Sequence, residues 1–321
     1  MQKIRVGVVR GGPSSEYAIS LKTGENVLKN LDTGKYAPID ILLTTRGDWY
    51  VRGVRTDLGT IAEHVDIVWN ALHGAYGEDG KVQRLFKSFG ILYTGSDVLG
   101  SAIGMHKGLA KERFREAGLR TPEGVIATRT SNLDDIMPAL IKSPNLRPPI
   151  IVKPVFGGSS VAPRIVRNIP ELEEAIELMG RYGDVLLEEY IAGKGAMVCV
   201  VDGSAMGERI ALFPAETIPY TTGAFYDSDI KREGGSQIIC QSNFTTSACD
   251  ELRSLAVKAH QAIGARHYSQ TNFIVSSNGI YVLEINTLPR LDVLFSSALE
   301  KGGVEFSEFL DHVIELSLAG K

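Results

Sequence analysis

The segment Tyr281-Val-Leu-Glu-Ile-Asn-Thr-Leu-Pro289 combines a strand pattern with two polar side chains of a particular kind. Its β-branched, aromatic and aliphatic residues predict a strand that stops at Pro289. Because side chains alternate across a strand, we expect Glu284 and Asn286 on the same face. A carboxylate and an amide oxygen close together suit Mg²⁺, which completes its shell with water and substrate phosphates. A strand with two solvated polar residues has the same local pattern, so the rest of the chain must decide.

The composition indicates the general class of protein. A chain of 321 residues exceeds one typical core, so two or three domains are expected. The net charge of −4 and the lack of a basic run give no sign of nucleic-acid binding. Three cysteines without metal spacing suit a reducing cytosol. No apolar segment is long enough to span a membrane, and the sequence starts with a strand rather than a signal peptide. We therefore expect a cytoplasmic protein.

The first segment predicts a small α/β domain with a parallel sheet. A strand at Ile4–Val9 runs through a glycine-rich turn into a helix that ends near Leu31. Ser14 and Ser15 are expected to cap the start of this helix. A strand, a glycine-rich turn and a helix N-terminus together favour an anion or a carboxylate. Glu16, in the first helical turn, either stabilises the helix dipole or binds a ligand.

A second glycine-rich loop follows the strand at residues 65–70. The loop His73-Gly-Ala-Tyr-Gly-Glu-Asp-Gly80 places a histidine and two acids at the carboxyl end of that strand. Ligands of open α/β sheets bind at this edge. A helix is then expected over residues 81–89.

The middle of the chain has the pattern of a phosphate site. One helix is predicted over residues 101–117, with Lys107 and Lys111 one turn apart, and residues 130–149 are interpreted as a loose surface segment. The strand at residues 149–154 carries Lys153 and leads into Gly157-Gly-Ser-Ser160. Backbone N–H groups and hydroxyls of such a loop bind phosphates, although the same four residues alone are more often a flexible turn.

The last segment predicts a second layer of strands and helices. A strand at residues 185–191 is expected to offer its backbone to an adenine ring. A helix over residues 249–264 precedes a hairpin of residues 272–275 and 280–285, whose turn is Ser277-Asn278-Gly279. A final amphipathic helix is expected at residues 306–318.

Seven short motifs occur in order along nearly the whole chain. They are Gly11-Gly-Pro-Ser-Ser-Glu16, His73-Gly-Ala-Tyr-Gly-Glu-Asp-Gly80, Tyr93-Thr-Gly-Ser96, Met105-His-Lys107, Lys153-Pro-Val-Phe-Gly-Gly-Ser-Ser-Val161, Phe225-Tyr-Asp227 and Leu283-Glu-Ile-Asn-Thr-Leu-Pro289. Together they make the chain resemble the D-alanine–D-alanine ligases of the ATP-grasp superfamily. The resemblance implies an α/β ATP-grasp fold with an N-terminal parallel-sheet domain. The expected divisions are residues 1–96, 97–184 and 185–321.

The resemblance also implies a reaction and roles for matched residues. ATP would phosphorylate the carboxylate of one D-alanine, and the amine of a second would attack the acyl phosphate, for peptidoglycan precursor synthesis. The implied nucleotide contacts are Lys107, Lys153, Ser159, Ser160, Glu188, Glu189, Tyr190, Ile191 and Lys231. The implied ligands of Mg²⁺, or of Mn²⁺ in its place, are Glu284, Asn286 and Asn272. The implied substrate contacts are Glu16, His73, Ser296 and Ser297, and a homodimer is the expected assembly.

Several positions depart from the family pattern near the expected chemistry. Gln270 and Asn272 stand where the family has a catalytic arginine and a metal-binding aspartate. Gly195 replaces an acid that contacts the nucleotide. Arg290 follows the metal strand where a glycine is expected, and Arg232 replaces a tyrosine of a mobile loop. The interpreted catalytic set is therefore Glu16, Ser159, Arg290 and Arg232.

The departures leave three interpretations of the activity open. The first is a D-alanine–D-alanine ligase with a rearranged site. The second is an ATP-grasp ligase for other amino-acid-like substrates. The third is a nucleotide-binding paralogue without turnover, because losing an oxyanion-type donor alone costs about 3 to 4 kcal/mol of transition-state stabilisation.

Overall fold

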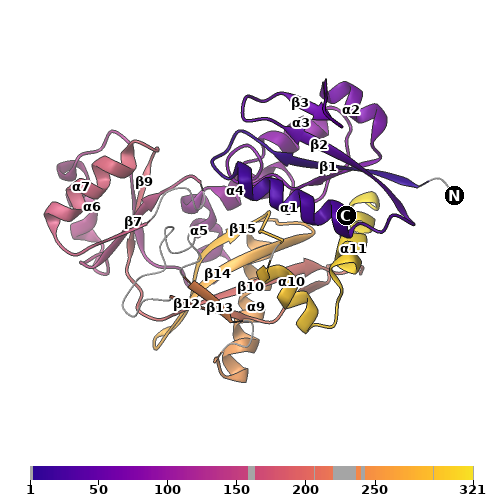
Figure 1. The fold of residues 1–321 in the computed structure, drawn as a ribbon. Coiled ribbons are helices and arrows are strands. Elements are labelled where there is room, and N and C mark those ends of the chain that lie inside the picture. Colours follow the sequence, from indigo (N-terminus) through magenta and orange to yellow (C-terminus); the bar gives the residue numbers. More distant parts are fainter. Residues whose placement is uncertain are drawn as a thin grey trace.

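The computed structural model describes residues 3–157, 163–205, 207–219, 236–239, 243–291 and 293–320. Its described strands form three sheets, each covered by helices (Figure 1). Within these residues, no helix has both the length and the apolar character needed to cross a membrane. The mixed α/β architecture agrees with the predicted fold class.

The N-terminal sheet has the strand order β4-β3-β2-β1-β5. Its elements are β1 (Ile4–Gly11), α1 (Tyr17–Asn30), β2 (Tyr36–Leu43), β3 (Trp49–Val51), β4 (Val54–Thr56), α2 (Leu58–His64), β5 (Ile67–Asn70) and α3 (Lys81–Ser88). β1 pairs with β2 and β5 in parallel, as predicted. The β3–β4 hairpin, which was not predicted, extends the sheet by antiparallel pairing with β2. Its turn residues Arg52 and Gly53 both have positive φ, the geometry of a tight two-residue hairpin.

The central sheet has the strand order β6-β9-β7-β8. The elements of this region are α4 (Val98–Met105), α5 (Lys107–Glu116), β6 (Gly124–Ala127), α6 (Leu133–Lys142), β7 (Ile150–Pro154), β8 (Arg164–Val166), α7 (Ile169–Gly180) and β9 (Val185–Glu189). β9 pairs with β6 and β7, so the central sheet includes residues up to Glu189. The full set of domain boundaries stays a prediction.

Two predictions for this region were wrong. The helix expected over residues 101–117 is interrupted at His106, which ends α4 and begins α5. His106 forms an antiparallel bridge with Phe156, and the Lys107 N–H donates to the Val155 carbonyl. The expected loose segment contains α6, whose capping box is formed by Asn132 and Asp135. Its buried apolar side chains pack on the central sheet.

The C-terminal sheet has the order β13-β12-β10-β14-β15, with β11 paired to β10. Its elements are β10 (Lys194–Asp202), β11 (Arg209–Ala211), β12 (Ala215–Pro219), β13 (Ser236–Ile239), α9 (Thr246–Ala262), β14 (Tyr268–Ser276), β15 (Gly279–Asn286), α10 (Val293–Lys301) and α11 (Phe306–Leu318). The predicted β14–β15 hairpin and the last two predicted helices are confirmed. α9 packs its buried leucine and alanines on this sheet.

One hydrophobic core joins the first and last parts of the chain. α11 contacts β5 and α1, and Figure 1 shows it beside the N-terminal sheet. The rings of Trp69 and Phe309 have centroids 6.2 Å apart, and those of Tyr268 and Phe309 are 5.5 Å apart. All three rings are buried in the same cluster. This core holds the loop after β5 against the loop after β15.

Candidate active site

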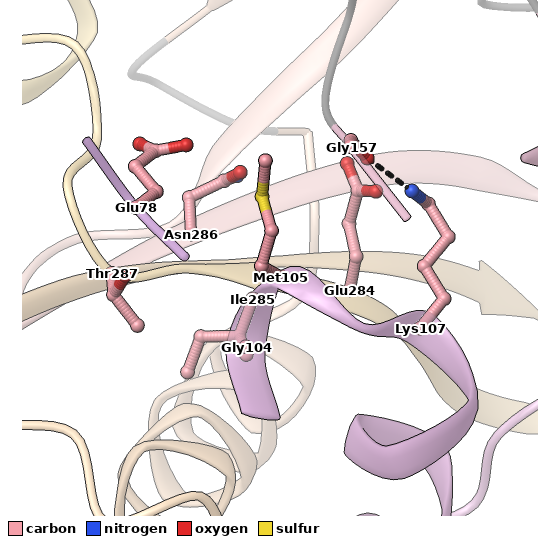
Figure 2. A pocket seen from close by; sticks show the side chains of 9 residues that line it. All are labelled: Glu78, Gly104, Met105, Lys107, Gly157, Glu284, Ile285, Asn286 and Thr287. Carbon is pink, nitrogen blue, oxygen red and sulfur yellow. Dashed lines mark hydrogen bonds between the residues drawn. The ribbon is translucent and has the colours of Figure 1, made fainter. Parts of the chain in front are cut away.

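A small pocket, partly open to solvent, lies where segments from the three sheets meet. It is lined by Glu78, Gly104, Met105, Lys107, Gly157, Glu284, Ile285, Asn286 and Thr287 (Figure 2). These residues come from the loop after β5, the α4–α5 junction, the segment after β7 and the end of β15. Figure 2 shows Glu78 and Asn286 toward one end, and Glu284 and Lys107 toward the other. The cavity therefore brings together segments that the sequence analysis assigned to substrate, metal and phosphate.

The break between α4 and α5 orients Lys107. Its side chain is largely buried, and Nζ donates to the Gly157 carbonyl oxygen over 2.5 Å. Gly157 begins the predicted phosphate loop, whose Ser159 and Ser160 lie outside the described residues, as do Lys231 and Arg232. The ammonium group of Lys107 therefore contacts the first residue of that loop, an arrangement suited to phosphate.

Four polar side chains extend from one face of the β14–β15 hairpin. Gln270 pairs with Asn286 across the strands, and Asn272 pairs with Glu284. Asn272 Nδ2 donates to Glu284 Oε1 over 2.9 Å, and Gln270 Nε2 donates to Asn272 Oδ1 over 3.0 Å. Glu284 and Asn286 line the cavity, whereas Asn272 is not among its lining residues. A carboxylate and an amide oxygen in the same cavity as Lys107 suit one Mg²⁺, and the ligand assignment stays a prediction.

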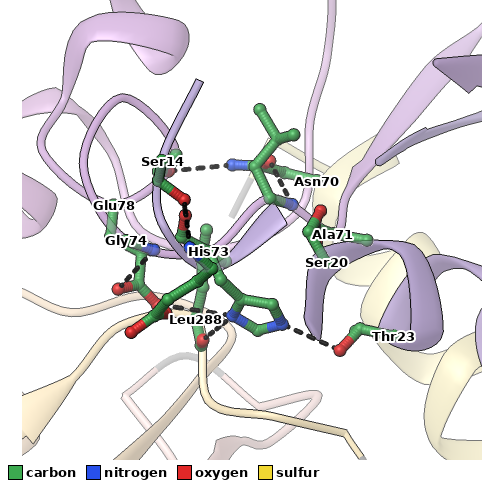
Figure 3. A network of polar contacts seen from close by, with 12 residues as sticks. Ser14, Ser20, Thr23, Asn70, Ala71, His73, Gly74, Glu78 and Leu288 are labelled. Atoms are coloured by element: carbon green, nitrogen blue, oxygen red, sulfur yellow. Dashed lines mark hydrogen bonds and ion pairs between the residues drawn. The ribbon is translucent and has the colours of Figure 1, made fainter. Parts of the chain in front are cut away.

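His73 is buried in a network of hydrogen bonds behind the cavity (Figure 3). Its Nδ1 lies 3.1 Å from the Leu288 carbonyl oxygen, and its Nε2 lies 2.8 Å from Thr23 Oγ1. Because a carbonyl only accepts, Nδ1 carries a proton and donates to Leu288, while Nε2 shares a hydrogen bond with the threonine hydroxyl. The ring thus joins α1 to the segment after β15.

Ser14 links the first glycine-rich turn to the same network. Its hydroxyl donates to the His73 carbonyl oxygen over 2.6 Å and accepts the Glu16 N–H over 3.1 Å. The predicted serine cap of α1 is therefore wrong in detail. The N-cap residue of α1 is Glu16 rather than a serine, and the Glu16 side chain makes no cap hydrogen bond.

Two carboxylates flank Gly74. Glu78 Oε2 accepts the Gly74 N–H over 3.2 Å, and a Cβ added at Gly74 would lie 3.6 Å from Glu16 Cδ. Burial raises the pKa of Glu78 above its usual range, and the negative charge of Glu16 acts in the same direction. Two such acids beside His73 suit a ligand ammonium group, which would relieve their repulsion. Glu16 was predicted as a substrate contact, whereas Glu78, one of the two acids in its loop, was given no role.

A buried charge cluster lies behind the predicted phosphate site. Glu188 is 2% exposed, its Oε2 lies 2.6 Å from Lys153 Nζ, and its Oε1 accepts from Lys111 Nζ. Burial lowers the pKa of Lys111 to about 8, although the charge of Glu188 opposes this. Burial alone would raise the pKa of Glu188, but the charges of the two lysines hold it below its usual range. We name Lys111, Glu188 and Lys153 the charge triad.

The charge triad gives two residues side-chain partners that the sequence did not predict. The carboxylate of Glu188 lies between two lysines, and the predicted contact of its segment with adenine stays a prediction. Lys111 was noticed but given no role. Its spacing from Lys107 was visible, but its partner is 77 residues away.

The other predicted residues lie around this centre. Glu189 accepts the Glu123 N–H over 3.2 Å at the end of β9, and Tyr190 and Ile191 follow it half-buried. Ser296 and Ser297 are half-buried on α10, and Arg290 is exposed. No nucleotide or second-substrate contact of these residues is tested, so their assignments stay predictions.

The glycine at position 195 has a local structural cause. A Cβ there would lie 2.1 Å from Thr217 Oγ1 on the paired strand β12. An acid at this position would therefore require the Thr217 side chain to turn away.

Comparisons with known proteins match the whole chain. The family model described as "D-ala D-ala ligase C-terminus" matches residues 114–315, and "D-ala D-ala ligase N-terminus" matches residues 5–60 and 52–96. A D-alanine–D-alanine ligase of Syntrophobacter fumaroxidans is 36% identical, over 99% of this chain and 98% of that protein.

Two solved structures show the same fold. The VanG D-Ala:D-Ser ligase of Enterococcus faecalis has a TM-score of 0.85 at 27% identity, covering 98% of this chain and 100% of that one. The D-alanine–D-alanine ligase of Bacillus anthracis, complexed with ATP, has a TM-score of 0.81 at 28% identity. The match covers 100% of this chain and 98% of that one. The chain therefore belongs to the D-alanine–D-alanine ligase family.

Proposed function

We propose that this protein joins two D-alanine molecules in an ATP-dependent reaction, with Mg²⁺, in the cytoplasm. The observation that carries this proposal is the shared cavity of Glu78, Lys107, Glu284 and Asn286. It places an acid suited to an ammonium group in one space with a lysine suited to phosphate and oxygens suited to a cation. Family membership supports the same reaction.

Each step has residues suited to it. The carboxylate of the first D-alanine attacks the terminal phosphorus of ATP, and ADP leaves, giving an acyl phosphate. The neutral amine of the second D-alanine attacks the acyl carbon, loses a proton and expels inorganic phosphate. Glu16 and Glu78 bind the first ammonium group, so that its carboxylate faces the phosphate. Lys107 and Lys153 stabilise the charge on the phosphate oxygens.

A bound Mg²⁺ would withdraw charge from the phosphate oxygens. Glu284 and Asn286 would hold it, since both line the cavity. The β14–β15 hairpin fixes the spacing of these two side chains, because they extend from one face of the same strand.

A second candidate is a ligase with a different second substrate. The observation that favours it is Arg290, an exposed cationic side chain three residues after the cavity-lining Thr287. The VanG relative, named a D-Ala:D-Ser ligase, has the same fold. D-Serine and a D-hydroxy acid are therefore the alternatives to test first.

The test measures phosphate release and identifies the product by mass spectrometry. D-Alanine with ATP and Mg²⁺ is expected to yield the dipeptide, ADP and phosphate in equal amounts, and L-alanine is the control. Product formed only with D-alanine plus another acceptor would favour the second candidate. Nucleotide binding without any product would contradict both. Analytical ultracentrifugation of the same sample tests the predicted homodimer.

A further inference from the structure

Gln270, Asn272 and Glu284 form a continuous chain of side-chain hydrogen bonds, which we name the amide chain. It runs from Gln270 Nε2 to Asn272 Oδ1, and from Asn272 Nδ2 to Glu284 Oε1. Gln270 and Asn272 are largely buried, and Gln270 Nε2 also contacts Met197 Sδ at 3.5 Å. Cross-strand pairing fixes the backbone of all three residues. The amide chain is therefore held from its buried end.

The chemistry of the three groups fixes which atoms face each other. An ionised carboxylate only accepts, so the Asn272 amide must turn its NH₂ group toward Glu284. Its carbonyl oxygen then faces Gln270, which must present its own NH₂ group. To bind a cation beside Glu284, the Asn272 amide would have to rotate so that its Oδ1, rather than its NH₂ group, faces the Glu284 carboxylate. Gln270 would have to turn with it and give up the contact with Met197.

The charge of this face points the same way. Among the four polar side chains Gln270, Asn272, Glu284 and Asn286, only Glu284 is an acid. Hard divalent cations bind most strongly where several anionic oxygens converge. A face with one carboxylate balances much less positive charge than a face with two. The motif resemblance places a second, metal-binding carboxylate at the position of Asn272.

We propose that this site holds a single divalent cation per bound nucleotide, through Glu284 and Asn286. Asn272 and Gln270 are positioning residues that hold the Glu284 carboxylate and occupy the space of a second cation. This inference rests on the proposed function, because it takes the ligand to be a nucleotide with its cation.

The test counts Mn²⁺ ions by electron paramagnetic resonance, with a non-hydrolysable ATP analogue bound. The unaltered protein is expected to bind one Mn²⁺ per analogue. Asn272→Asp is expected to bind two, because a carboxylate replaces the NH₂ group beside Glu284. Asn286→Ala is the control for the remaining site, and its single Mn²⁺ is expected to bind at least about tenfold more weakly.

The outcomes separate this inference from the proposed function. Two Mn²⁺ ions in the unaltered protein would overturn the inference and leave the proposed function standing. One Mn²⁺ in a folded Asn272→Asp variant would also overturn it, since the amide would not be what excludes the second ion. If the analogue does not bind at all, the proposed function and the inference both fail. The count in the unaltered protein decides the matter even where the variant does not fold.

Discussion

Lys153 Nζ lies 2.6 Å from Oε2 of Glu188, although Lys153 is the lysine that the sequence assigns to the ATP phosphates. Lys111, on the opposite side, bonds to the other oxygen of the same buried carboxylate. Two lysines and one glutamate leave a net positive charge next to the predicted phosphate loop. Lys111 thus prevents Glu188 from neutralising Lys153 completely.

Replacing Lys111 with methionine is expected to destabilise the fold by about 3 kcal/mol, because it leaves a buried carboxylate with one partner fewer. Urea unfolding measures this change. The double variant Lys111→Met with Glu188→Gln should recover part of the loss, since the uncompensated charge is gone. Lys142→Met, on the exposed side of α6, is the matched control. Equal unfolding midpoints for Lys111→Met and the control would contradict the role of the charge triad.

Replacing Lys153 with alanine is expected to weaken ATP binding at least about tenfold, since a charged hydrogen bond to a phosphate contributes roughly 1.5 to 3 kcal/mol. Isothermal titration calorimetry measures the affinity, and circular dichroism checks that the variant is folded. Lys142→Ala is the control. Unchanged affinity in a folded Lys153→Ala protein would remove Lys153 from the phosphate site.

Glu78→Gln is expected to unfold at a higher urea concentration than the unaltered protein at pH 7. Burial raises the pKa of Glu78 in the folded state, so its ionised form opposes folding above that pKa. Glutamine removes this cost. The difference in stability should therefore narrow as the pH is lowered through the raised pKa of Glu78, where the folded protein takes up the proton.

Asp79→Asn is the neighbouring control for that measurement. Asp79 accepts the N–H groups of Tyr76 and Lys81 and pairs with the Lys81 ammonium group at 2.9 Å. Its replacement should lower the stability at pH 7. A destabilised Glu78→Gln protein would show that the hydrogen bonds of Glu78 outweigh its burial.

Glu16→Gln is expected to raise the KM for the first amino acid about tenfold or more, and to change the KM for ATP much less. The reason is that its carboxylate lies beside Gly74, whose N–H donates to the cavity-lining Glu78, where we assign the ammonium group. Glu25→Gln, in the exposed ion pair with Lys29 on the same helix, serves as the control. Equal effects of both variants would leave Glu16 as a residue of the helix N-terminus only.

Arg290→Gly tests whether a charge that the family places at position 270 has moved to the other side of the cavity. If Arg290 contacts the phosphoryl group, kcat is expected to fall about a hundredfold, as for a lost oxyanion donor. The kcat of Arg290→Lys should then lie between those of the unaltered protein and Arg290→Gly, because lysine keeps the charge but loses the paired donors. Higher activity of Arg290→Gly would instead show that the arginine obstructs the site.

Local patterns predicted the elements whose signals lie within a few residues. The β14–β15 hairpin followed from its alternation and its Asn278-Gly279 turn, and Glu284 and Asn286 do line the cavity. The interruption at His106 was not predictable in this way, because it depends on pairing with Phe156 far along the chain. α6 was missed because Pro138 and the polar residues around it resemble a loop.

The charges of the site were the least predictable part. Lys111, Glu188 and Lys153 lie on separate elements and meet only when the central sheet folds. The sequence shows that each is charged but not which other residue each contacts. Likewise, the orientation of Asn272 depends on Gln270 and Glu284 together.

The core that joins β5 to α11 sets an order of events in biosynthesis. Trp69 emerges from the ribosome long before Phe309, against which it packs. Until α11 has been synthesised, the N-terminal sheet has one apolar face without its final cover. The first domain to be made is therefore among the last to be completed.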